Sequence, residues 1–275
     1  MASITTRDGV SLYVKDWGRG RPVVLLHGWP LSADTFDDLG MAIADAGMRA
    51  IAYDRRGFGR SDQPWGGYEY DTLATDLADV IERKELRGAA LVGFSMGGGE
   101  VVRYLARFRD HTVTQAALIG SVVPYMLQTA DNPKGVPSAV FDQMAQGIAA
   151  DRAKFWAGFF PQFYGTGVLS GSVSREVIEW SRQMAMQASL KATLDCARAF
   201  ATTDFRPDLK AVAVPTLIIH GTDDATVPID VSSRQAAAGI AGSVLEEYDG
   251  GPHGLLASHK DQIRDDVLAF LRAGR

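Results

Sequence analysis

The chain has 275 residues, 46% of them hydrophobic and 22% charged, a composition that allows one large α/β domain or two smaller ones. Its formal net charge of −5 is spread along the sequence without a Lys/Arg-rich stripe, which argues against nucleic-acid binding. The first ten residues lack the basic and then apolar pattern of a secretory signal, and no apolar run is long enough to cross a bilayer, so we expect a cytoplasmic protein without membrane contact.

The predicted elements alternate along the chain between short strands and helices. Each strand run is mostly apolar on both faces and ends at Gly, Asp or Ser, which is typical of parallel strands covered by helices. Apolar residues with helical spacing follow at 73–81 and again at 263–271. This alternation predicts an α/β fold with a mostly parallel central sheet. The expected strands are residues 22–28, 48–54, 89–95, 114–121, 215–221 and 243–250.

The alternation stops between about residues 124 and 208. No strand-like run appears there, and the apolar spacing is helical. The turn-rich segment D-N-P-K-G-V-P, residues 131–137, marks the way into this region. We therefore predict a helical lid over residues 124–208, inserted into a core domain formed by residues 1–123 and 209–275.

One predicted strand ends in a serine surrounded by glycines. Residues 89–99 read A-A-L-V-G-F-S-M-G-G-G, so a G-x-S-x-G pentapeptide joins a strand directly to a helix. This is the signature of a nucleophile elbow, a tight turn that lifts the serine hydroxyl above the sheet edge. Gly93 and Gly97 occupy the positions where side chains would collide in that turn. The alternative is an ordinary glycine-rich turn, but the flanking strand and helix favour Ser95 as a nucleophile.

A serine nucleophile needs a base and an orienting acid, here in the chain order Ser, Asp, His. The segment H-G-T-D-D-A-T-V-P follows a predicted strand and carries Asp223 and Asp224 at its carboxyl end, where such sheets place their sites. We prefer Asp224, although spacing alone does not decide between the two. His253 lies in the loop D-G-G-P-H-G after the last strand, free to reach Ser95.

The other four histidines are expected to be structural. His111 and His259 are predicted at helix ends on the surface. His27 and His220 each follow a strand and precede Gly, so we expect them to brace loops.

An acyl-transfer site also needs donors for the oxyanion that forms at the attacked carbonyl. One is expected to be the backbone N–H of Met96, directly after the nucleophile, and the other the backbone N–H of Trp29 in H-G-W-P. Pro30 has no N–H, and its ring is expected to help aim the Trp29 carbonyl.

Several longer motifs resemble one group of enzymes. They are H-G-W-P, Y-D-R-R-G-F-G-R-S-D, V-G-F-S-M-G-G-G-E, D-N-P-K-G-V-P, S-L-K-A-T-L-D-C, F-A-T-T-D-F-R-P-D and G-P-H-G-L-L. Together they resemble the cofactor-free haloperoxidase, perhydrolase and aryl-esterase group of the α/β-hydrolases over nearly the whole chain. The resemblance implies an α/β-hydrolase fold with its lid after the sixth strand, a Ser95, Asp224 and His253 triad, no metal or organic cofactor, and a trimer or hexamer.

The resemblance also implies an apolar pocket for a small acyl group. Its expected lining comes from the lid and from the loop beside the acid, together with Pro30. A pocket of this kind excludes water from the serine. Two of its members depart from some relatives, which carry phenylalanine in place of Met126 and isoleucine in place of Thr226. The expected substrate-binding residues are Pro30, Met126, Phe141, Phe159, Phe163, Phe200, Thr226 and Val227.

These residues predict a serine hydrolase of small carboxylic esters. An acyl-serine would form and be released by water, or by hydrogen peroxide to give a peracid that oxidises halide in solution. Cleavage of a γ-lactam or another amide on the same triad is an alternative, as is a non-catalytic ligand-binding protein on the same fold. Metal chemistry is not expected, because there is no H-E-x-x-H motif and Cys196 is the single cysteine, predicted to be buried.

Overall fold

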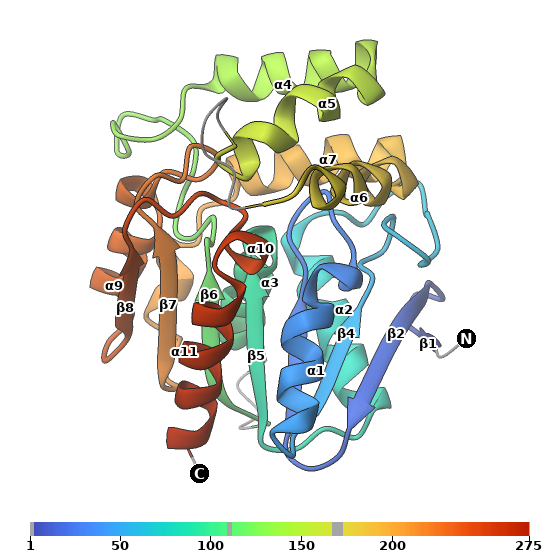
Figure 1. The fold of residues 1–275 in the computed structure, drawn as a ribbon, viewed down its shortest axis with the longest axis vertical. Coiled ribbons are helices and arrows are strands. Elements are labelled where there is room, and N and C mark those ends of the chain that lie inside the picture. The colour runs from blue at the N-terminus through green and yellow to red at the C-terminus, as the bar shows by residue number, and fades with distance from the viewer. Residues whose placement is uncertain (1–2, 109–111, 167–172, 275) are drawn as a thin grey trace.

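The computed structural model describes residues 3–108, 112–166 and 173–274. These residues form one eight-stranded sheet with the order β1-β2-β4-β3-β5-β6-β7-β8 (Figure 1). The predicted α/β fold with a mostly parallel sheet is confirmed. The strands are β1 (Ser3–Thr5), β2 (Ser11–Gly18), β3 (Pro22–Leu26), β4 (Arg49–Tyr53), β5 (Ala89–Phe94), β6 (Val113–Ile119), β7 (Thr216–Gly221) and β8 (Val244–Tyr248).

Two strands precede the first one that sequence analysis identified. β1 pairs with β2 and β2 pairs with β4, both antiparallel, whereas the pairs from β4 across to β8 are parallel. In β2 the burial alternates only over its first half and no residue run is uniformly apolar, so the strand lacks the signal of a sheet strand covered on both faces. At the opposite edge, β8 is mostly exposed rather than buried, because no strand pairs beyond it in the described sheet.

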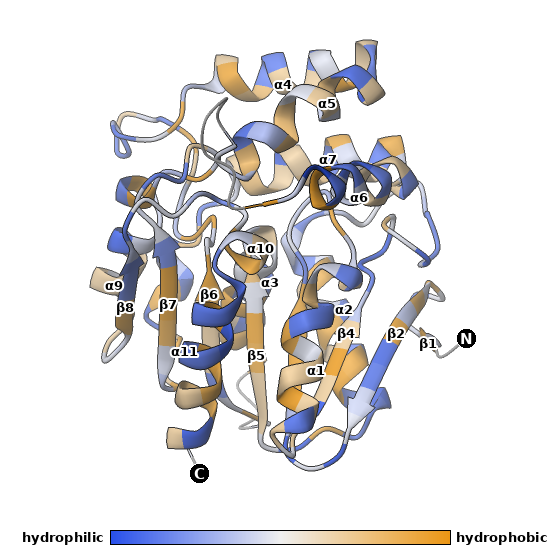
Figure 2. Cartoon of the chain, in the orientation of Figure 1, coloured by the Kyte–Doolittle hydropathy of each residue, from blue (hydrophilic) through white to orange (hydrophobic). Residues whose placement is uncertain are grey.

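Helices cover both faces of the sheet (Figure 1). On one face lie α1 and α11, which contact each other, and on the other face α2 packs against α3. Figure 2 shows the apolar strands between helices whose outward faces are polar. The predicted helical spacing is confirmed, since Leu73, Leu77 and Val80 are fully buried in α2. The helices beside the sheet are η1 (Ala33–Phe36), α1 (Asp37–Asp45), α2 (Tyr70–Arg83), α3 (Met96–Arg107), η2 (Ile229–Val231), α9 (Ser233–Gly239), α10 (Leu255–Ser258) and α11 (Lys260–Ala273), and α8 (Arg206–Leu209) packs against α3 and α9 just before β7.

The region between β6 and β7 is helical and stands above the carboxyl ends of the strands (Figure 1). It contains α4 (Ser138–Ala150), α5 (Arg152–Phe163), α6 (Arg175–Gln187) and α7 (Leu190–Thr202), with α4 packed on both α5 and α7. Its role as a lid and the boundaries 124 and 208 stay predictions.

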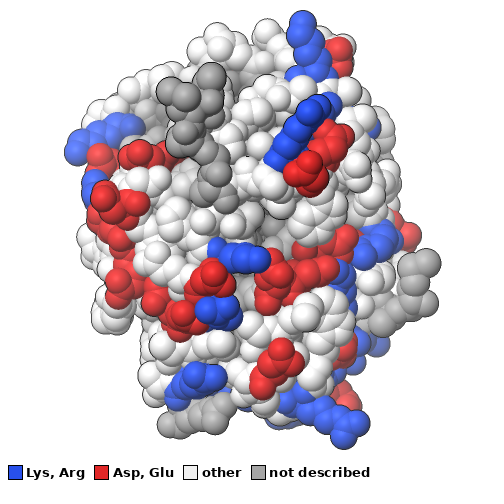
Figure 3. All heavy atoms as spheres, viewed as in Figure 1, with Lys and Arg blue, Asp and Glu red and all other residues white. Residues whose placement is uncertain are grey.

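The surface shows two further features. Charged residues of both signs are scattered over the face drawn in Figure 3, without a continuous basic stripe on that face. In the described ranges, no helix is both long and apolar enough to cross a membrane.

Candidate active site

Ser95 lies in a sharp turn between β5 and α3. Its φ of +53° falls in the left-handed region, which is costly for a residue with a side chain and is typical of a strained nucleophile turn. The Ser95 N–H donates to Ile119 O at the end of β6, at 2.8 Å. A Cβ on Gly93 would lie 2.5 Å from Gly97 O, and one on Gly97 would overlap Leu26 O, so both positions require glycine.

Ser95, His253 and Asp224 form one hydrogen-bonded chain. His253 Nε2 lies 2.9 Å from Ser95 Oγ, and His253 Nδ1 lies 2.6 Å from Asp224 Oδ2. All three side chains are buried. The neighbouring Asp223 is exposed, so the structure puts Asp224 and not Asp223 against the imidazole.

The Asp224 carboxylate is surrounded by donors. The backbone N–H groups of Thr226 and Val227 donate to its Oδ1 at 2.9 and 2.7 Å. Burial alone would raise the pKa of Asp224, but the charge of His253 and hydrogen bonds from His220 and His253 outweigh burial and hold this pKa well below its usual range. These contacts favour the ionised form of Asp224.

The two segments expected to supply oxyanion donors lie beside Ser95. A Cβ on Gly28 would lie 3.0 Å from the Cβ of Ser95, so the loop after β3, which continues into Trp29, passes directly over the serine. Met96 is the first residue of α3, where helical N–H groups have no partner within the helix. That the backbone N–H groups of Trp29 and Met96 hold the oxyanion stays a prediction.

The Trp29 side chain points away from the sheet and into the helical region. Its Nε1 donates to Thr193 O in α7 at 2.9 Å. Its ring packs edge-on against Trp156, Phe159 and Phe200, with centroids 5.2 to 5.8 Å apart. The loop that crosses the serine is thus tied to α5 and α7.

Three comparisons with known proteins give the family of the chain. The family model of the α/β hydrolase fold matches residues 21–259. A non-heme chloroperoxidase of Kitasatospora aureofaciens is 41% identical over 98% of this chain and 99% of its own, and a bifunctional esterase/perhydrolase of Acinetobacter calcoaceticus is 41% identical over 99% and 100%. The crystal structure of a bromoperoxidase from Bacillus anthracis superposes with a TM-score of 0.94 at 41% identity, covering 98% and 100% of the two chains.

The chain belongs to the α/β-hydrolase family. The resemblance seen in its sequence motifs is confirmed, and so is the expected fold. Within the part of the hydrolase that the structure describes, no group of three or more His, Cys, Asp or Glu side chains is placed to hold a metal ion.

Four of the eight expected pocket residues of the hydrolase lie in one cluster of aromatic rings that reaches His253. Phe159 contacts both Trp29 and Phe163, and the Phe163 ring lies 4.9 Å from the ring of His253. The rings of Phe200 and Phe141 pack edge to face, with their centroids 6.3 Å apart. Met126 and Pro30 are buried in the same core, with Met126 O accepting from Val136 N at 2.7 Å.

Two expected pocket residues have another contact. Thr226 and Val227 meet the site through their backbone N–H groups on Asp224, and Val227 is buried whereas Thr226 is half-buried. The A-T-V-P segment therefore orients the acid in addition to any contact with a substrate.

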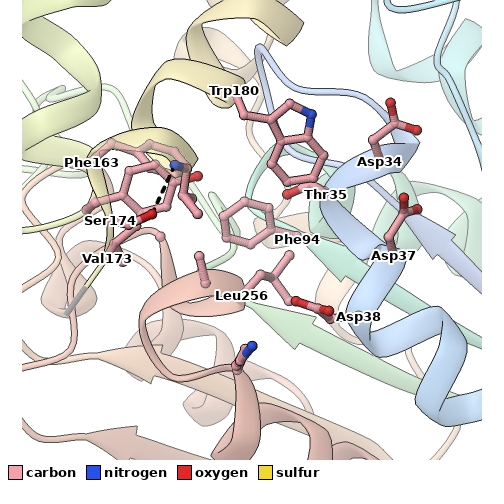
Figure 4. A pocket seen from close by; sticks show the side chains of 15 residues that line it. Asp34, Thr35, Asp37, Asp38, Phe94, Phe163, Val173, Ser174, Trp180 and Leu256 are labelled. Atoms are coloured by element: carbon pink, nitrogen blue, oxygen red, sulfur yellow. Dashed lines mark hydrogen bonds between the residues drawn. The ribbon is translucent and has the colours of Figure 1, made fainter.

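A cavity of about 380 Å³ opens beside this cluster, between α6, α10 and the start of α1 (Figure 4). Phe94 and Phe163 line it, and their rings lie 5.2 and 4.9 Å from the ring of His253. Trp180 and Leu256 complete its apolar wall, and Asp37 stands at its rim. None of the three hydrogen-bonded residues Ser95, Asp224 and His253 lines this cavity.

Sequence analysis missed a buried ion pair of the hydrolase that contacts the loop from His27 to Trp29, where Trp29 is expected to supply an oxyanion donor. Arg55 donates from Nη2 to His27 O at 2.6 Å and from Nε to Glu100 Oε1 at 2.5 Å. Tyr53 donates to Glu100 Oε2 at 3.1 Å. Burial raises the pKa of Glu100 to about 7 despite Arg55. The pair joins the loop that leads to Trp29 to the helix that begins beside Ser95, and the double arginine in Y-D-R-R-G was the available signal.

The remaining histidines divide as follows. His27 and His220 are buried at strand ends and hydrogen-bonded to loops, as expected. His259 is half-buried at the start of α11, and His111 lies outside the described residues. Cys196 is fully buried, as expected, and burial raises the pKa of its thiol well above the usual value.

Proposed function

We propose that this hydrolase cleaves small carboxylic esters through an acyl-Ser95 intermediate, and that hydrogen peroxide can replace water to give a peracid. The observation that carries the proposal is the chain of contacts from Ser95 Oγ through His253 to Asp224 at 2.9 and 2.6 Å, closed over by aromatic rings. The chloroperoxidase, the bromoperoxidase and the esterase/perhydrolase named above add support over almost the full chain length.

The mechanism begins with proton transfer to His253. As Ser95 Oγ attacks the ester carbonyl, His253 Nε2 accepts its proton, and Asp224 holds the Nδ1–H tautomer and stabilises the imidazolium. The backbone N–H groups of Trp29 and Met96 stabilise the oxyanion. Collapse of the tetrahedral intermediate passes the His253 proton to the leaving alcohol.

The second half returns the enzyme to its starting state. Water, deprotonated by His253, attacks acyl-Ser95 and releases the carboxylic acid. Hydrogen peroxide attacking in the same way releases a peracid, and the peracid then oxidises halide in solution. The rings of Phe159, Phe163 and Phe200 form an apolar cluster that reaches His253, and we expect this cluster to favour a small apolar acyl group and to limit the access of bulk water to the intermediate.

The first experiment is intact-mass spectrometry after brief exposure to an aryl acetate. The wild type is expected to gain one acetyl group, mapped to Ser95 by peptide analysis, and Ser95→Ala to gain none. An acetyl group on another residue would contradict the assignment. The absence of both adduct and turnover would favour the ligand-binding alternative, whereas turnover of a γ-lactam in place of the ester would favour the amide hydrolase.

Two finer proposals have different grounds: the oligomer rests on the resemblance, and the location rests on the absence of a signal-like or membrane-spanning apolar pattern in the sequence. A trimer or hexamer is proposed for the protein in solution, and a cytoplasmic location in the cell. Sedimentation velocity tests the first, with a monomer as the contradicting result, and fractionation of the source cells tests the second.

A further inference from the structure

His220 is a second histidine in contact with the Asp224 carboxylate. It lies near the end of β7, fully buried. Its Nε2 is 2.8 Å from Val227 O and 3.1 Å from Asp224 Oδ2, and its Nδ1 is 2.6 Å from Ser233 Oγ. One imidazole thus links the strand, the loop that carries the acid and the first residue of α9.

These contacts determine where His220 carries its proton. Val227 O can only accept, so Nε2 carries a proton, and Nδ1 faces the Ser233 hydroxyl. The Nε2–H is shared between Val227 O and Asp224 Oδ2. The carboxylate oxygen that faces His253 therefore receives a second hydrogen bond.

Few other charged groups face His220. Glu247 is its partner in the register between β7 and β8, and the Glu247 carboxylate is bonded to Arg234, with Arg234 Nε 2.8 Å from Oε1. On β6, the neighbouring pairs of β7 are apolar, Leu118 with Ile218 and Ile119 with Ile219. Among the described residues, Asp224 is the carboxylate within hydrogen-bond distance of the His220 ring.

We propose that His220 is a positioning residue that fixes the Asp224 carboxylate and withdraws part of its negative charge from His253. The proposal rests on the proposed triad function. A carboxylate that gives up charge to a second donor stabilises the imidazolium of His253 less, so His253 returns its proton to the leaving group more readily. The backbone donors at Thr226 and Val227 act on the other oxygen, which leaves His220 as the neighbour that competes with His253 for Oδ2.

The test is the pH profile of kcat/KM for an aryl acetate in three variants. His220→Leu removes the hydrogen bond to Oδ2, and we expect its acid limb to move upward by roughly 0.5 to 1 pH unit with kcat about tenfold lower. His220→Gln places an amide N–H near the position of Nε2 and should restore most of both changes. Ser233→Ala removes only the contact at Nδ1 and should leave the acid limb within about 0.2 pH unit of the wild type.

A purely structural role would lower kcat or the melting temperature without moving the acid limb, and that result in His220→Leu would overturn the proposal. If His220→Leu does not fold, ¹⁵N spectra of the imidazoles in the wild type decide instead. A proton on Nε2 of His220 is expected, and a proton on Nδ1 would refute the shared hydrogen bond. A wild type without ester turnover would contradict the proposed function, while these spectra would still test the contact.

Discussion

Two histidines occupy the same local sequence in two parts of this sheet, and their surroundings are opposite. His27 follows β3 and His220 lies near the end of β7, each just before a glycine and each buried. His27 lies beside a cation, with Arg55 Nη1 3.4 Å from its Nδ1, and the backbone N–H of Arg55 donates to its Nε2 at 3.0 Å. His220 faces the Asp224 carboxylate instead.

The difference also reverses the tautomer. His27 Nδ1 lies 2.9 Å from Gly28 O, so Nδ1 carries the proton and Nε2 accepts from Arg55. In His220 the proton is on Nε2, which donates to Val227 O. Burial, together with the charge of Arg55, holds the pKa of His27 well below its usual value. In both histidines, the ring nitrogen that carries the proton is the one that faces a backbone carbonyl oxygen.

The largest expected effect comes from replacing Asp224, the carboxylate that His220 contacts. Asp224→Asn should lower kcat for an aryl acetate by about 10⁴-fold, because an amide in place of the carboxylate favours the wrong His253 tautomer and cannot stabilise the imidazolium. Steady-state kinetics measure the loss. Asp223→Asn is the matched control, since Asp223 is exposed, and a greater loss there would move the acid to Asp223.

The second largest effect is expected from replacing Arg55, which contacts His27 at the start of the loop that leads to Trp29. Arg55→Met removes the hydrogen bond to His27 O and should lower kcat by about 10²-fold with little change in KM. The same variant leaves Glu100 buried without its partner, so the free energy of unfolding should fall by about 3 kcal/mol. Adding Glu100→Leu should recover the stability and not the rate; recovery of both would mean that the ion pair serves packing alone.

A smaller effect is expected from the side chain of Trp29, in the loop that begins at His27. Trp29→Phe keeps the backbone N–H but loses the hydrogen bond from Nε1 to Thr193 O. With that tie to α7 removed, kcat should fall about tenfold. Trp180→Phe serves as the control, because Trp180 is 41% exposed and lines the neighbouring cavity. An equal loss of kcat in both variants would count against a specific role for the hydrogen bond from Trp29 to Thr193.

The smallest effect is a pH dependence of stability at Glu100. Its folded pKa of about 7 lies above the ordinary 4.5, so on raising the pH the unfolded chain releases this proton first and the free energy of unfolding falls across that window. Glu100→Gln should flatten the fall of the melting temperature with pH. Asp76, with a pKa raised by burial to about 6, still titrates in the same direction below that value. The contrast should therefore be clearest between pH 6 and 7, and parallel profiles there would contradict it.

The parallel sheet and the three hydrogen-bonded side chains were predictable because their signals are local. G-F-S-M-G together with the strand before it and the helix after it predicts Ser95 as the nucleophile, and strand ends that periodicity locates predict His253 and one of Asp223 and Asp224, with spacing alone not deciding between these two. β2 was missed because a half-exposed, antiparallel strand beside the edge strand carries a weak pattern.

Contacts between side chains distant in sequence could not be predicted in the same way. Arg55 and Glu100 are 45 residues apart, and the double arginine in Y-D-R-R-G indicates a charge at the end of β4 but not its partner in α3. His220 was expected to brace a loop, but its contact with Asp224 depends on how the turn at residues 222–226 folds back. Sequence patterns show which residues end a strand, whereas the packing of neighbouring elements decides what those residues touch.

The crowding around the nucleophile turn limits how this protein can change. Gly28, Gly93 and Gly97 have no space for even one methyl group, since each would meet a neighbouring ring or carbonyl at once. Mutational freedom is therefore distributed unevenly: the turn tolerates no variation, while ring positions such as Phe141, Phe159 and Phe200 lie on separate helices that carry no part of the turn. A library made to alter acyl specificity can leave the three glycine codons untouched and place its diversity on α4, α5 and α7.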